Sequence, residues 1–550
     1  MKKKLKWIFG FLFIGILITG FYPGKGDIYF EISKNLDLLG RVYKEISFNY
    51  VDEIDPEKFL RAGIQGMLSS LDPYTIFIDE KKIEDIDLIT NGTYGGIGIS
   101  IGIRGDDVTV VEVMDGYAAQ RQGIRIGDII IEAGGKKISP ENIDDISSLV
   151  KGEPGSTVEL KIVRDELRDT VLFNLVREEV IVKNVTYSGF YPEKSNNVYL
   201  KLSNFSRAAS DEIKKTIKEL KEQKPIKSIV FDLRGNPGGL LDIAVDICDK
   251  LLARDQLVVS TRGRDPSSEK QYFSREEPIV DKDVKIILLI NSGSASASEI
   301  VAGALQDHDR AVILGTKSFG KGLVQTITPL SYNTSLKITT AKYYTPSGRC
   351  IQRIDYSEGS EIIKNLRPES DQKFFTDNKR EMFAKGGITP DTTVEFNIDG
   401  ELTKDLLAKG YFFKFANNFY YNNPNIEYSN LADDKLFKDF KDFLTNENFS
   451  YKSQAEIEID NLVKGVTGQD GIKKDLLKIK NELAGLFSKE MQIYKHEILM
   501  EIKSELAARY LGMEGRIQEQ LNYDEQVQVA IRIINDQSTY NHLLNIHTMN

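Results

Sequence analysis

Ser296 and Lys321 are the residues of this chain whose types and surroundings best suit nucleophilic chemistry. Ser296 lies in a segment of small residues, Asn-Ser-Gly-Ser-Ala-Ser-Ala-Ser-Glu at 291–299, and Lys321 stands between two glycines. A serine hydroxyl is a weak nucleophile near neutral pH and needs an adjacent base. The pair therefore predicts a serine nucleophile with a lysine base, which indicates an acyl-transfer enzyme and most simply a protease.

The lysine can act as a base only when it is neutral, and the ordinary pKa of a lysine is about 10.4. Burial beside apolar groups such as Phe319 would lower that pKa. Gln325 would lie near Lys321 in either a helix or a strand, so its amide is predicted to orient the lysine amine without adding charge. Lys317 is the competing candidate, and it ranks lower because no glycines flank it.

Attack by a serine on a carbonyl carbon creates an oxyanion, which backbone N–H groups can stabilise. Ala297 follows the nucleophile, and the Gly238–Gly239 pair would come from a neighbouring strand end, where glycine allows a close approach. We predict that Gly239 and Ala297 form the oxyanion hole. His308 is the histidine nearest to the serine in sequence. It is predicted to lie near the far end of the following helix and to have a structural role.

Residues 177–398 alternate strand and helix patterns, which predicts an α/β core with functional loops at the carboxyl ends of its strands. The buried strand 284–291 would deliver the serine segment, and the buried strand 227–233 would deliver the glycine pair. The other predicted strands and helices of this core are 197–202, 311–315, 210–220, 240–253 and 298–307.

Residues 92–176 are rich in strand patterns and resemble a PDZ domain, because a Gly-Gly-Ile-Gly stretch precedes a strand and a later Gly-Asp-Ile-Ile segment. Adjacent glycines let backbone N–H groups gather round a carboxylate, and a free strand edge can pair with an extended peptide. The candidate peptide-binding residues are Gly95, Gly96, Ile97, Gly98 and Ile99.

Residues 1–25 carry lysines followed by an uncharged apolar run, the pattern of a signal anchor or of a cleaved signal peptide. We favour the uncleaved anchor, because no Ala-x-Ala site follows the run. Both alternatives predict export to a bacterial periplasm or cell envelope, and the anchor would tether the protein to the inner membrane. Residues 26–91 show apolar residues at helical spacing, which predicts a helical region for packing or dimerisation.

Residues 399–550 are rich in charged residues and predict a C-terminal helical domain, whose role stays open between dimerisation and partner docking. Its predicted helices are 401–409, 430–446, 472–512 and 524–534. The net charge of −10 and the pI near 5.3 argue against nucleic acid as a partner. With 2 cysteines and 4 histidines, the chain is predicted to have neither a disulfide framework nor a metal site, and no cofactor is expected.

These motifs resemble, in their order along the chain, those of the carboxyl-terminal processing proteases, which are PDZ-containing Ser/Lys peptidases. The resemblance covers roughly residues 35–395. Besides the segments around Ser296 and Lys321, it rests on Asp-Leu-Arg-Gly-Asn-Pro-Gly-Gly at 232–239, Thr-Pro-Ser-Gly-Arg at 345–349 and Gly-Ile-Thr-Pro-Asp at 387–391.

The resemblance implies a multidomain α+β protein, in which a PDZ β-domain is inserted before an α/β serine-protease core of the crotonase/Clp-protease type. Helical N- and C-terminal regions flank these two parts. The implied roles are Ser296 as nucleophile, Lys321 as general base, Gln325 as the residue that orients the lysine, and Gly239 and Ala297 as oxyanion donors. The resemblance also implies protein substrates with apolar C-terminal tails and a PDZ domain that recognises the tail and gates access. It leaves room for a homodimer and for an adaptor or activator protein.

Two alternatives stay open from the sequence. In a non-catalytic PDZ peptide-binding scaffold the core would be a relic, which the complete set of Ser296, Lys321 and Gln325 disfavours. A crotonase-like ligand-binding protein on the same fold is disfavoured by the PDZ insertion.

Overall fold

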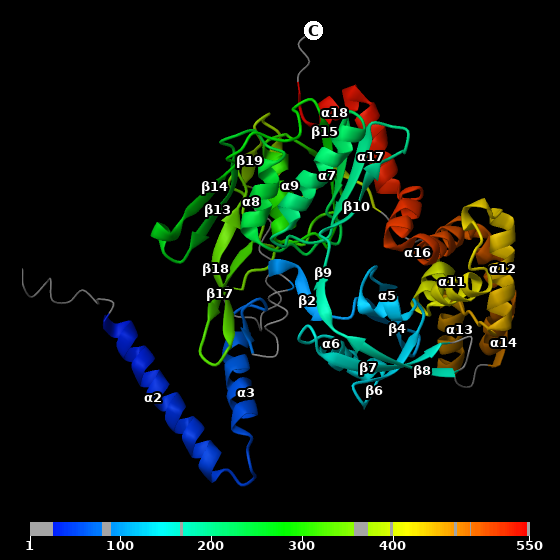
Figure 1. The fold of residues 1–550 in the computed structure, drawn as a ribbon, viewed down its shortest axis with the longest axis horizontal. Coiled ribbons are helices and arrows are strands. Elements are labelled where there is room, and N and C mark those ends of the chain that lie inside the picture. The colour runs from blue at the N-terminus through cyan, green and yellow to red at the C-terminus, as the bar shows by residue number, and fades with distance from the viewer. Residues whose placement is uncertain are drawn as a thin grey trace, which may run out of the picture. The chain divides into compact units, whose positions relative to one another are not determined.

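The chain forms two compact units, one ending at Phe77 and the other starting at Ile78 (Figure 1). The computed structural model describes residues 26–79, 88, 90–164, 169–356, 372–395, 400–466, 470–483 and 486–546. The predicted signal segment, residues 1–25, lies outside the described residues. Among the described helices, none combines the length and the apolar character that a membrane crossing requires.

The first unit contains the predicted N-terminal helices, α2 (Gly26–Asn49) and α3 (Pro56–Ser69). Asp55 caps α3 by accepting the N–H groups of the first turn, and a ring stack between Tyr43 and Phe59 at 5.5 Å joins the two helices. Much of the apolar surface of these helices stays exposed in the described unit. Its exposed apolar residues include Ile28, Phe30, Ile32, Leu36, Leu39, Val42, Leu60 and Met67.

The predicted PDZ domain is a twisted antiparallel sheet with strand order β3-β4-β5-β7-β8, covered by helices α5 (Ala118–Gln122) and α6 (Ile143–Val150). Its strands are β3 (Ile99–Arg104), β4 (Asp107–Val113), β5 (Ile129–Ala133), β6 (Lys136–Lys137), β7 (Thr157–Arg164) and β8 (Asp169–Val176). Strand β2 (Thr93–Gly96) pairs with β9 (Glu178–Ile181) where the chain enters and leaves this domain. The two paired segments therefore close the base of the insertion.

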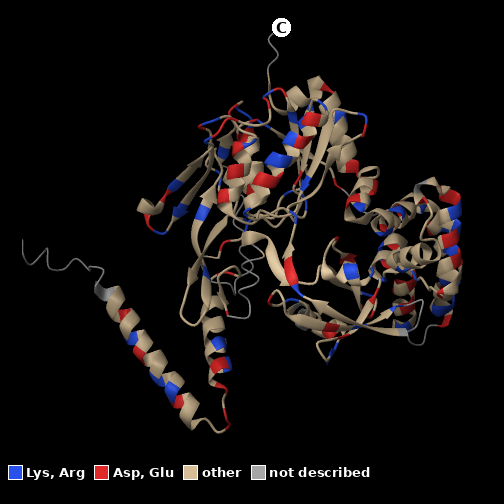
Figure 2. Cartoon of the chain, in the orientation of Figure 1, with Lys and Arg blue, Asp and Glu red and all other residues tan. Residues whose placement is uncertain are grey.

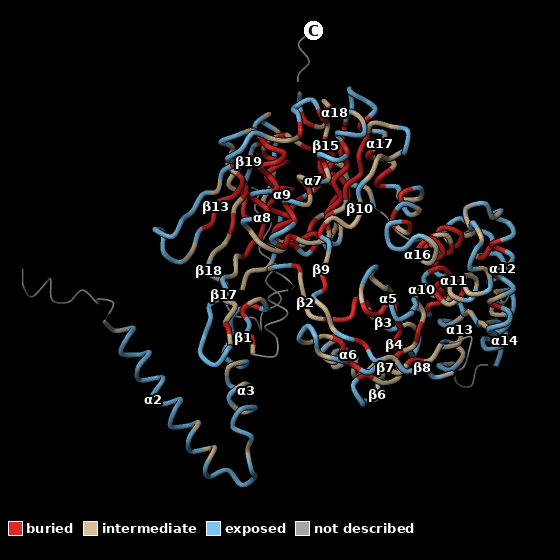
Figure 3. Tube along the Cα trace, in the orientation of Figure 1, coloured by how far each residue is buried: buried red, intermediate tan, exposed pale blue. Residues whose placement is uncertain are grey.

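The predicted α/β core is built on a six-stranded sheet of order β10-β11-β12-β15-β16-β21, parallel except for β10. Its strands are β10 (Val185–Phe190), β11 (Asn197–Leu202), β12 (Ser228–Asp232), β15 (Lys285–Ile290), β16 (Val312–Gly315) and β21 (Thr392–Thr393). The continuous apolar runs of its central strands require cover on both faces. Helices α7 (Ala209–Gln223), α8 (Leu241–Asp249) and α9 (Ala297–Asp307) bury one face (Figures 1 and 3).

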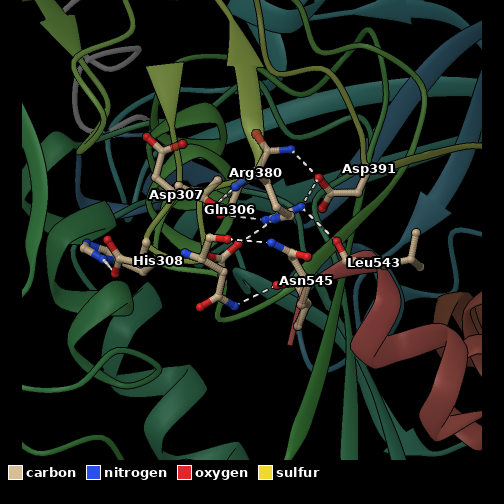
Figure 4. Close-up of polar contacts among 12 residues, drawn as sticks. Gln306, Asp307, His308, Arg380, Asp391, Leu543 and Asn545 are labelled. Carbon is tan, nitrogen blue, oxygen red and sulfur yellow. Dashed lines mark hydrogen bonds and ion pairs between the residues drawn. The ribbon is translucent and has the colours of Figure 1, made fainter. Parts of the chain in front are cut away.

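The opposite face of this sheet is buried by the last two helices of the chain, α17 (Glu525–Asn535) and α18 (Gln537–Leu543). Val527 and Ile533 belong to one apolar cluster with strand residues such as Val230. A polar anchor then fixes the chain after α18. Arg380 donates to the carbonyl oxygen of Leu543 and pairs with Asp391, and Asn545 donates to the carbonyl oxygen of Asn378 (Figure 4). The C-terminal segment is thus a layer of the α/β core.

The rest of the C-terminal region is a separate helical cluster with an aromatic core. Its helices are α10 (Glu401–Ala408), α11 (Tyr411–Asn422), α12 (Asp433–Asn446), α13 (Gln454–Gly465), α14 (Asp470–Leu483), α15 (Leu486–Ile493) and α16 (Lys495–Leu521). Charged residues of both signs are interspersed along its helices (Figure 2). Gly512, with φ 70°, interrupts α16 between this cluster and the segment that covers the six-stranded sheet.

An antiparallel sheet completes the α/β core and carries the segment that follows Lys321. It contains β13 (Leu257–Gly263), β14 (Lys270–Phe273), β17 (Leu323–Pro329) and β18 (Ser335–Tyr344). The two cysteines, Cys248 and Cys350, are buried and unbridged.

Candidate active site

Ser296 lies in the turn between strand β15 and helix α9, as predicted, and it is the N-cap residue of that helix. Its backbone has φ 54° and ψ −112°, a conformation that costs a non-glycine residue about 1–3 kcal/mol. Such strain persists only where surrounding contacts fix the backbone. The half-buried serine therefore has its hydroxyl held at the start of a helix, where free N–H groups gather.

Lys321 lies just before strand β17. Glycine is required on both sides of it, because the backbone there packs closely against another segment of the chain. A Cβ atom on Gly320 would lie 2.6 Å from Cβ of Arg353, and one on Gly322 would lie 2.7 Å from the backbone nitrogen of Gln352. The amine of the competing Lys317 donates to the carbonyl oxygen of Lys385. The glycines thus let the Lys321 segment pass tightly beside residues 352–353.

The buried carboxylate of Glu299 joins the serine and lysine segments. Its Oε2 atom accepts the backbone N–H groups of both Ser296 and Lys321, each at 2.9 Å. Its Oε1 atom accepts the Ser318 hydroxyl at 2.5 Å and the Gly320 N–H at 2.7 Å. Burial raises the pKa of Glu299, although these four hydrogen bonds oppose the shift. One carboxylate oxygen therefore holds both candidate catalytic residues.

The hydroxyl of Tyr343, on strand β18, fixes the same two residues from their carbonyl side. It lies 3.0 Å from the carbonyl oxygen of Ser296 and 2.5 Å from that of Lys321, so its single proton is shared between them. Glu299 and Tyr343 together bind the N–H and the C=O groups of both residues. Sequence reasoning missed both side chains. The Ser-x-x-Glu spacing of Ser296 and Glu299 is a capping-box signal that could have identified the carboxylate.

The glycine pair closely approaches Ser296, the candidate nucleophile, as the prediction of an oxyanion hole requires. Gly238 has φ 100°, and a Cβ atom on it would lie 2.8 Å from the backbone nitrogen of Ala297 and 2.9 Å from Cβ of Ser296. Within the described residues, the N–H groups of Gly239 and Ala297 have no hydrogen-bond acceptor. They are thus available to an oxyanion that forms beside Ser296.

Gln325 lies on strand β17, directly after a bulge in its pairing with β18. Its amide nitrogen donates to the carbonyl oxygen of Leu323 and to the hydroxyl of Thr339, each at 3.3 Å. These bonds hold the amide on the face of the strand pair. Its orientation of the Lys321 amine stays a prediction.

His308 lies at the opposite end of helix α9 from the serine, about 18 Å away at 1.5 Å per residue. Both of its ring nitrogens have partners, because Nδ1 lies 2.8 Å from a carboxylate oxygen of Asp377 and Nε2 lies 2.7 Å from the carbonyl oxygen of Leu257. Figure 4 shows it beside the polar cluster of Asp307 and Arg380. The histidine is structural, as predicted.

The candidate peptide-binding residues take different conformations from the glycine loop expected. Gly95 and Gly96 pair with β9 inside strand β2, and a Cβ atom on Gly95 would lie 1.9 Å from the carbonyl oxygen of Gly152. Ile97 is fully buried, and Gly98 adopts the left-handed conformation with φ 79°. Gly95 and Gly96 therefore close the base of the domain, because β9 must return the chain to the α/β core.

Strand β3, which begins at Ile99, is an edge strand of the PDZ sheet among the described strands. The strand begins at the residue directly after Gly98, so its unpaired edge starts beside that glycine. An extended peptide could add to that edge as a further strand.

Family models match the chain along most of its length. The model described as "Peptidase family S41" matches residues 196–358. Further matches are a "PDZ domain" at 109–164, a "Probable PDZ-protease, C-terminal helical domain" at 402–534 and an "Activating protease CtpB N-terminal domain" at 25–82. With the fold described above, these matches define a serine peptidase that carries a PDZ domain.

Two similar proteins identify the family more narrowly. The chain is 39% identical over 324 residues to a carboxy-terminal-processing protease of Bartonella bacilliformis, covering 58% of this chain and 73% of that protein. It is 31% identical over 336 residues to the carboxy-terminal processing protease CtpB of Bacillus subtilis, covering 61% and 69%. The chain belongs to the carboxy-terminal processing protease family. Among solved structures, a photosystem II D1 C-terminal processing protease matches with 26% identity and a TM-score of 0.36, covering 64% of this chain and 92% of that one.

Proposed function

We propose that this protease cleaves proteins near their C-termini with Ser296 as nucleophile and Lys321 as general base. The observation that carries the proposal is the shared carboxylate of Glu299, which accepts the N–H groups of both residues at 2.9 Å. No histidine among the described residues has this relation to the serine, since His308 lies at the far end of α9. Lysine is therefore the base that the geometry supports.

In the proposed reaction, the neutral Lys321 amine accepts the hydroxyl proton of Ser296 while Oγ attacks the scissile carbonyl carbon. The oxyanion of the tetrahedral intermediate accepts the N–H groups of Gly239 and Ala297. The lysine ammonium then gives its proton to the leaving amine, and the C–N bond breaks. Water hydrolyses the resulting ester in a second cycle with the same base, which regenerates the serine.

We infer that substrate tails bind along the outer edge of strand β3, with the terminal carboxylate near Gly98. The β3 edge and the left-handed Gly98 support this placement. Apolar tails suit the family resemblance, and occupation of the domain would gate access to Ser296. The candidate residues Gly95 and Gly96 contribute by closing the base of the domain.

Three further proposals concern the surroundings of the enzyme. Residues 1–25 would direct export to the bacterial cell envelope and anchor the protein in the inner membrane. The exposed apolar residues of α2 and α3 suit a homodimer contact, and an adaptor or activator protein is a further candidate partner. The net charge of −10 disfavours nucleic acid.

The proposal is tested with the full-length protein in detergent and an unfolded reporter whose apolar tail ends in a free or an amidated C-terminus. Ser296→Ala and Lys321→Ala should each abolish cleavage, whereas the matched control Lys317→Ala should retain it. Preference for the free carboxylate would support tail recognition. Cleavage that survives Ser296→Ala would refute the nucleophile assignment. Binding of the reporter without cleavage by the wild type would favour the non-catalytic scaffold.

A further inference from the structure

Arg234 connects the loop that carries the oxyanion glycines to the C-terminal helix α17. Its guanidinium group binds Asp232 through Nε at 2.9 Å and through Nη2 at 2.7 Å. The same group reaches α17, where Nη2 lies 2.6 Å from a carboxylate oxygen of Asp524 and Nη1 donates to the Gln526 side chain at 2.8 Å. Arg234 keeps only 12% of its side chain exposed, so these bonds form in a largely dry environment.

The loop that starts at Arg234 runs directly to the oxyanion donors. Its Asn236 carbonyl oxygen accepts the Ala295 N–H at 3.1 Å and the Ser298 hydroxyl at 2.9 Å, which ties the loop to both sides of the nucleophile. The Asn236 side chain accepts the N–H of Gly238 at 2.9 Å. A shift at the start of the loop would therefore reach the glycine that contacts the serine segment.

The start of α17 is anchored independently of Arg234. Asp524 is the N-cap residue and accepts the Val527 N–H at 3.1 Å, while the Gln526 amide donates to the carbonyl oxygen of Val394. Val527 is buried against the central sheet. Asp524 and Gln526 thus present fixed acceptors to which the arginine is attached.

Charge balance explains why a second carboxylate is needed beside the arginine. Asp232 is fully buried, and burial alone would raise its pKa, but the charges of Arg234 and Lys201 outweigh that effect and lower the pKa. Two cations therefore surround one buried anion. Asp524 supplies the second negative charge and fills the donor positions of the guanidinium that Asp232 leaves open.

We propose that Asp524 and Gln526 are positioning residues for peptide hydrolysis, because they hold Arg234 and thereby fix the Gly239 N–H in the oxyanion hole. This inference rests on the proposed function and gives the C-terminal segment a part in it. Loss of a whole oxyanion donor lowers kcat by roughly 10²–10³-fold. Loosening the loop that carries one donor should lower it less, by about tenfold.

The test compares Asp524→Asn and Gln526→Met with Glu525→Gln in the full-length protein. Glu525 is an exposed acidic residue of the same helix turn, so its substitution removes the same charge without touching Arg234. Both positioning variants should lower kcat about tenfold with KM within twofold of the wild type, and the control should leave both constants unchanged. The binding constant of a peptide boronate, which forms a tetrahedral adduct with the serine, should weaken about tenfold in parallel.

The boronate measurement separates positioning from folding. A variant that merely lowers the folded fraction would lose kcat while the remaining enzyme binds the boronate as tightly as the wild type, and that result would overturn the inference. Equal behaviour of Asp524→Asn, Gln526→Met and Glu525→Gln would also overturn it. Hydrolysis by Ser296→Ala at the wild-type rate would instead refute the proposed function itself. Failure of the positioning inference and failure of the proposed function are therefore distinguishable.

Discussion

Replacing Glu299 by glutamine tests whether one buried carboxylate positions both catalytic candidates. The carboxylate is fully buried and accepts two donors at each oxygen, Ser318 and Gly320 at Oε1, and Ser296 and Lys321 at Oε2. Glutamine has nearly the same shape but offers one oxygen and one NH₂ group. In either orientation, its NH₂ group faces two groups that are themselves donors.

The less costly orientation places the NH₂ group at the Oε1 position. There the Ser318 hydroxyl can rotate and accept, but the Gly320 N–H and the Ser318 O–H both lose the acceptor that Oε1 provided. An unsatisfied buried N–H costs about 1–3 kcal/mol, and the two remaining bonds lose their charge assistance. Removal of a buried charge offsets part of this, because burial raises the pKa of Glu299. We therefore expect a net loss of about 2 kcal/mol in the free energy of unfolding.

The effect on turnover should exceed the effect on stability. The unpaired Gly320 adjoins Lys321, and a misplacement of about 1 Å near the reacting groups can lower a rate by about 10²-fold. We expect Glu299→Gln to lower kcat by about 10–100-fold with KM little changed, measured on the tailed reporter beside thermal unfolding. Glu276→Gln, at a half-exposed carboxylate that pairs with Lys250, is the matched control. Turnover of Glu299→Gln within twofold of the control would refute the positioning role.

Three further substitutions each test one other structural statement. Tyr343→Phe should lower kcat about tenfold at constant KM, because it removes the hydroxyl shared by two carbonyl groups; an unchanged kcat would show that these bonds are dispensable. Gly238→Ala should abolish cleavage in a protein that still unfolds cooperatively, since its Cβ would lie 2.8 Å from the Ala297 nitrogen. Burial raises the pKa of Glu501 to about 7 from 4.5, so the folded state binds a proton that the unfolded chain has released. The free energy of unfolding should accordingly fall by up to about 3 kcal/mol as pH rises from 4.5 to 7. Glu501→Gln should remove that slope in denaturant titrations, and a persistent slope would contradict the assignment.

Local signals in the sequence predicted the strands and helices that carry the candidate site. The apolar run of β15 has no polar interruption, which predicts a strand buried on both faces. The small residues after it predict an exposed turn. The glycines on both sides of Lys321 favour a tight approach of the backbone, but they do not indicate the approached segment, residues 352–353, which lies in a later part of the chain. Such signals act over a few residues, and they identify a loop without identifying its partner.

Contacts between distant residues could not be predicted in this way. Arg234 meets Gln526 across 292 positions, and neither sequence segment indicates the other. Gly95 and Gly96 were interpreted as a loop, since a glycine pair favours turns, yet strand β9 pairs with them. In each case a tertiary contact decided the conformation.

The strain at Ser296 explains why so many groups converge on its backbone. A φ of 54° costs about 1–3 kcal/mol, and the turn would relax toward an ordinary helix start unless other contacts opposed it. Glu299 accepts the N–H group of Ser296, and Tyr343 lies against the carbonyl oxygen of Ser296. Gly238 packs so closely that no free space is left beside the Cβ atom of Ser296. These three groups come from α9, β18 and the loop after β12. Because α17 holds that loop through Arg234, the strained serine depends on the C-terminal segment as well as on its own helix.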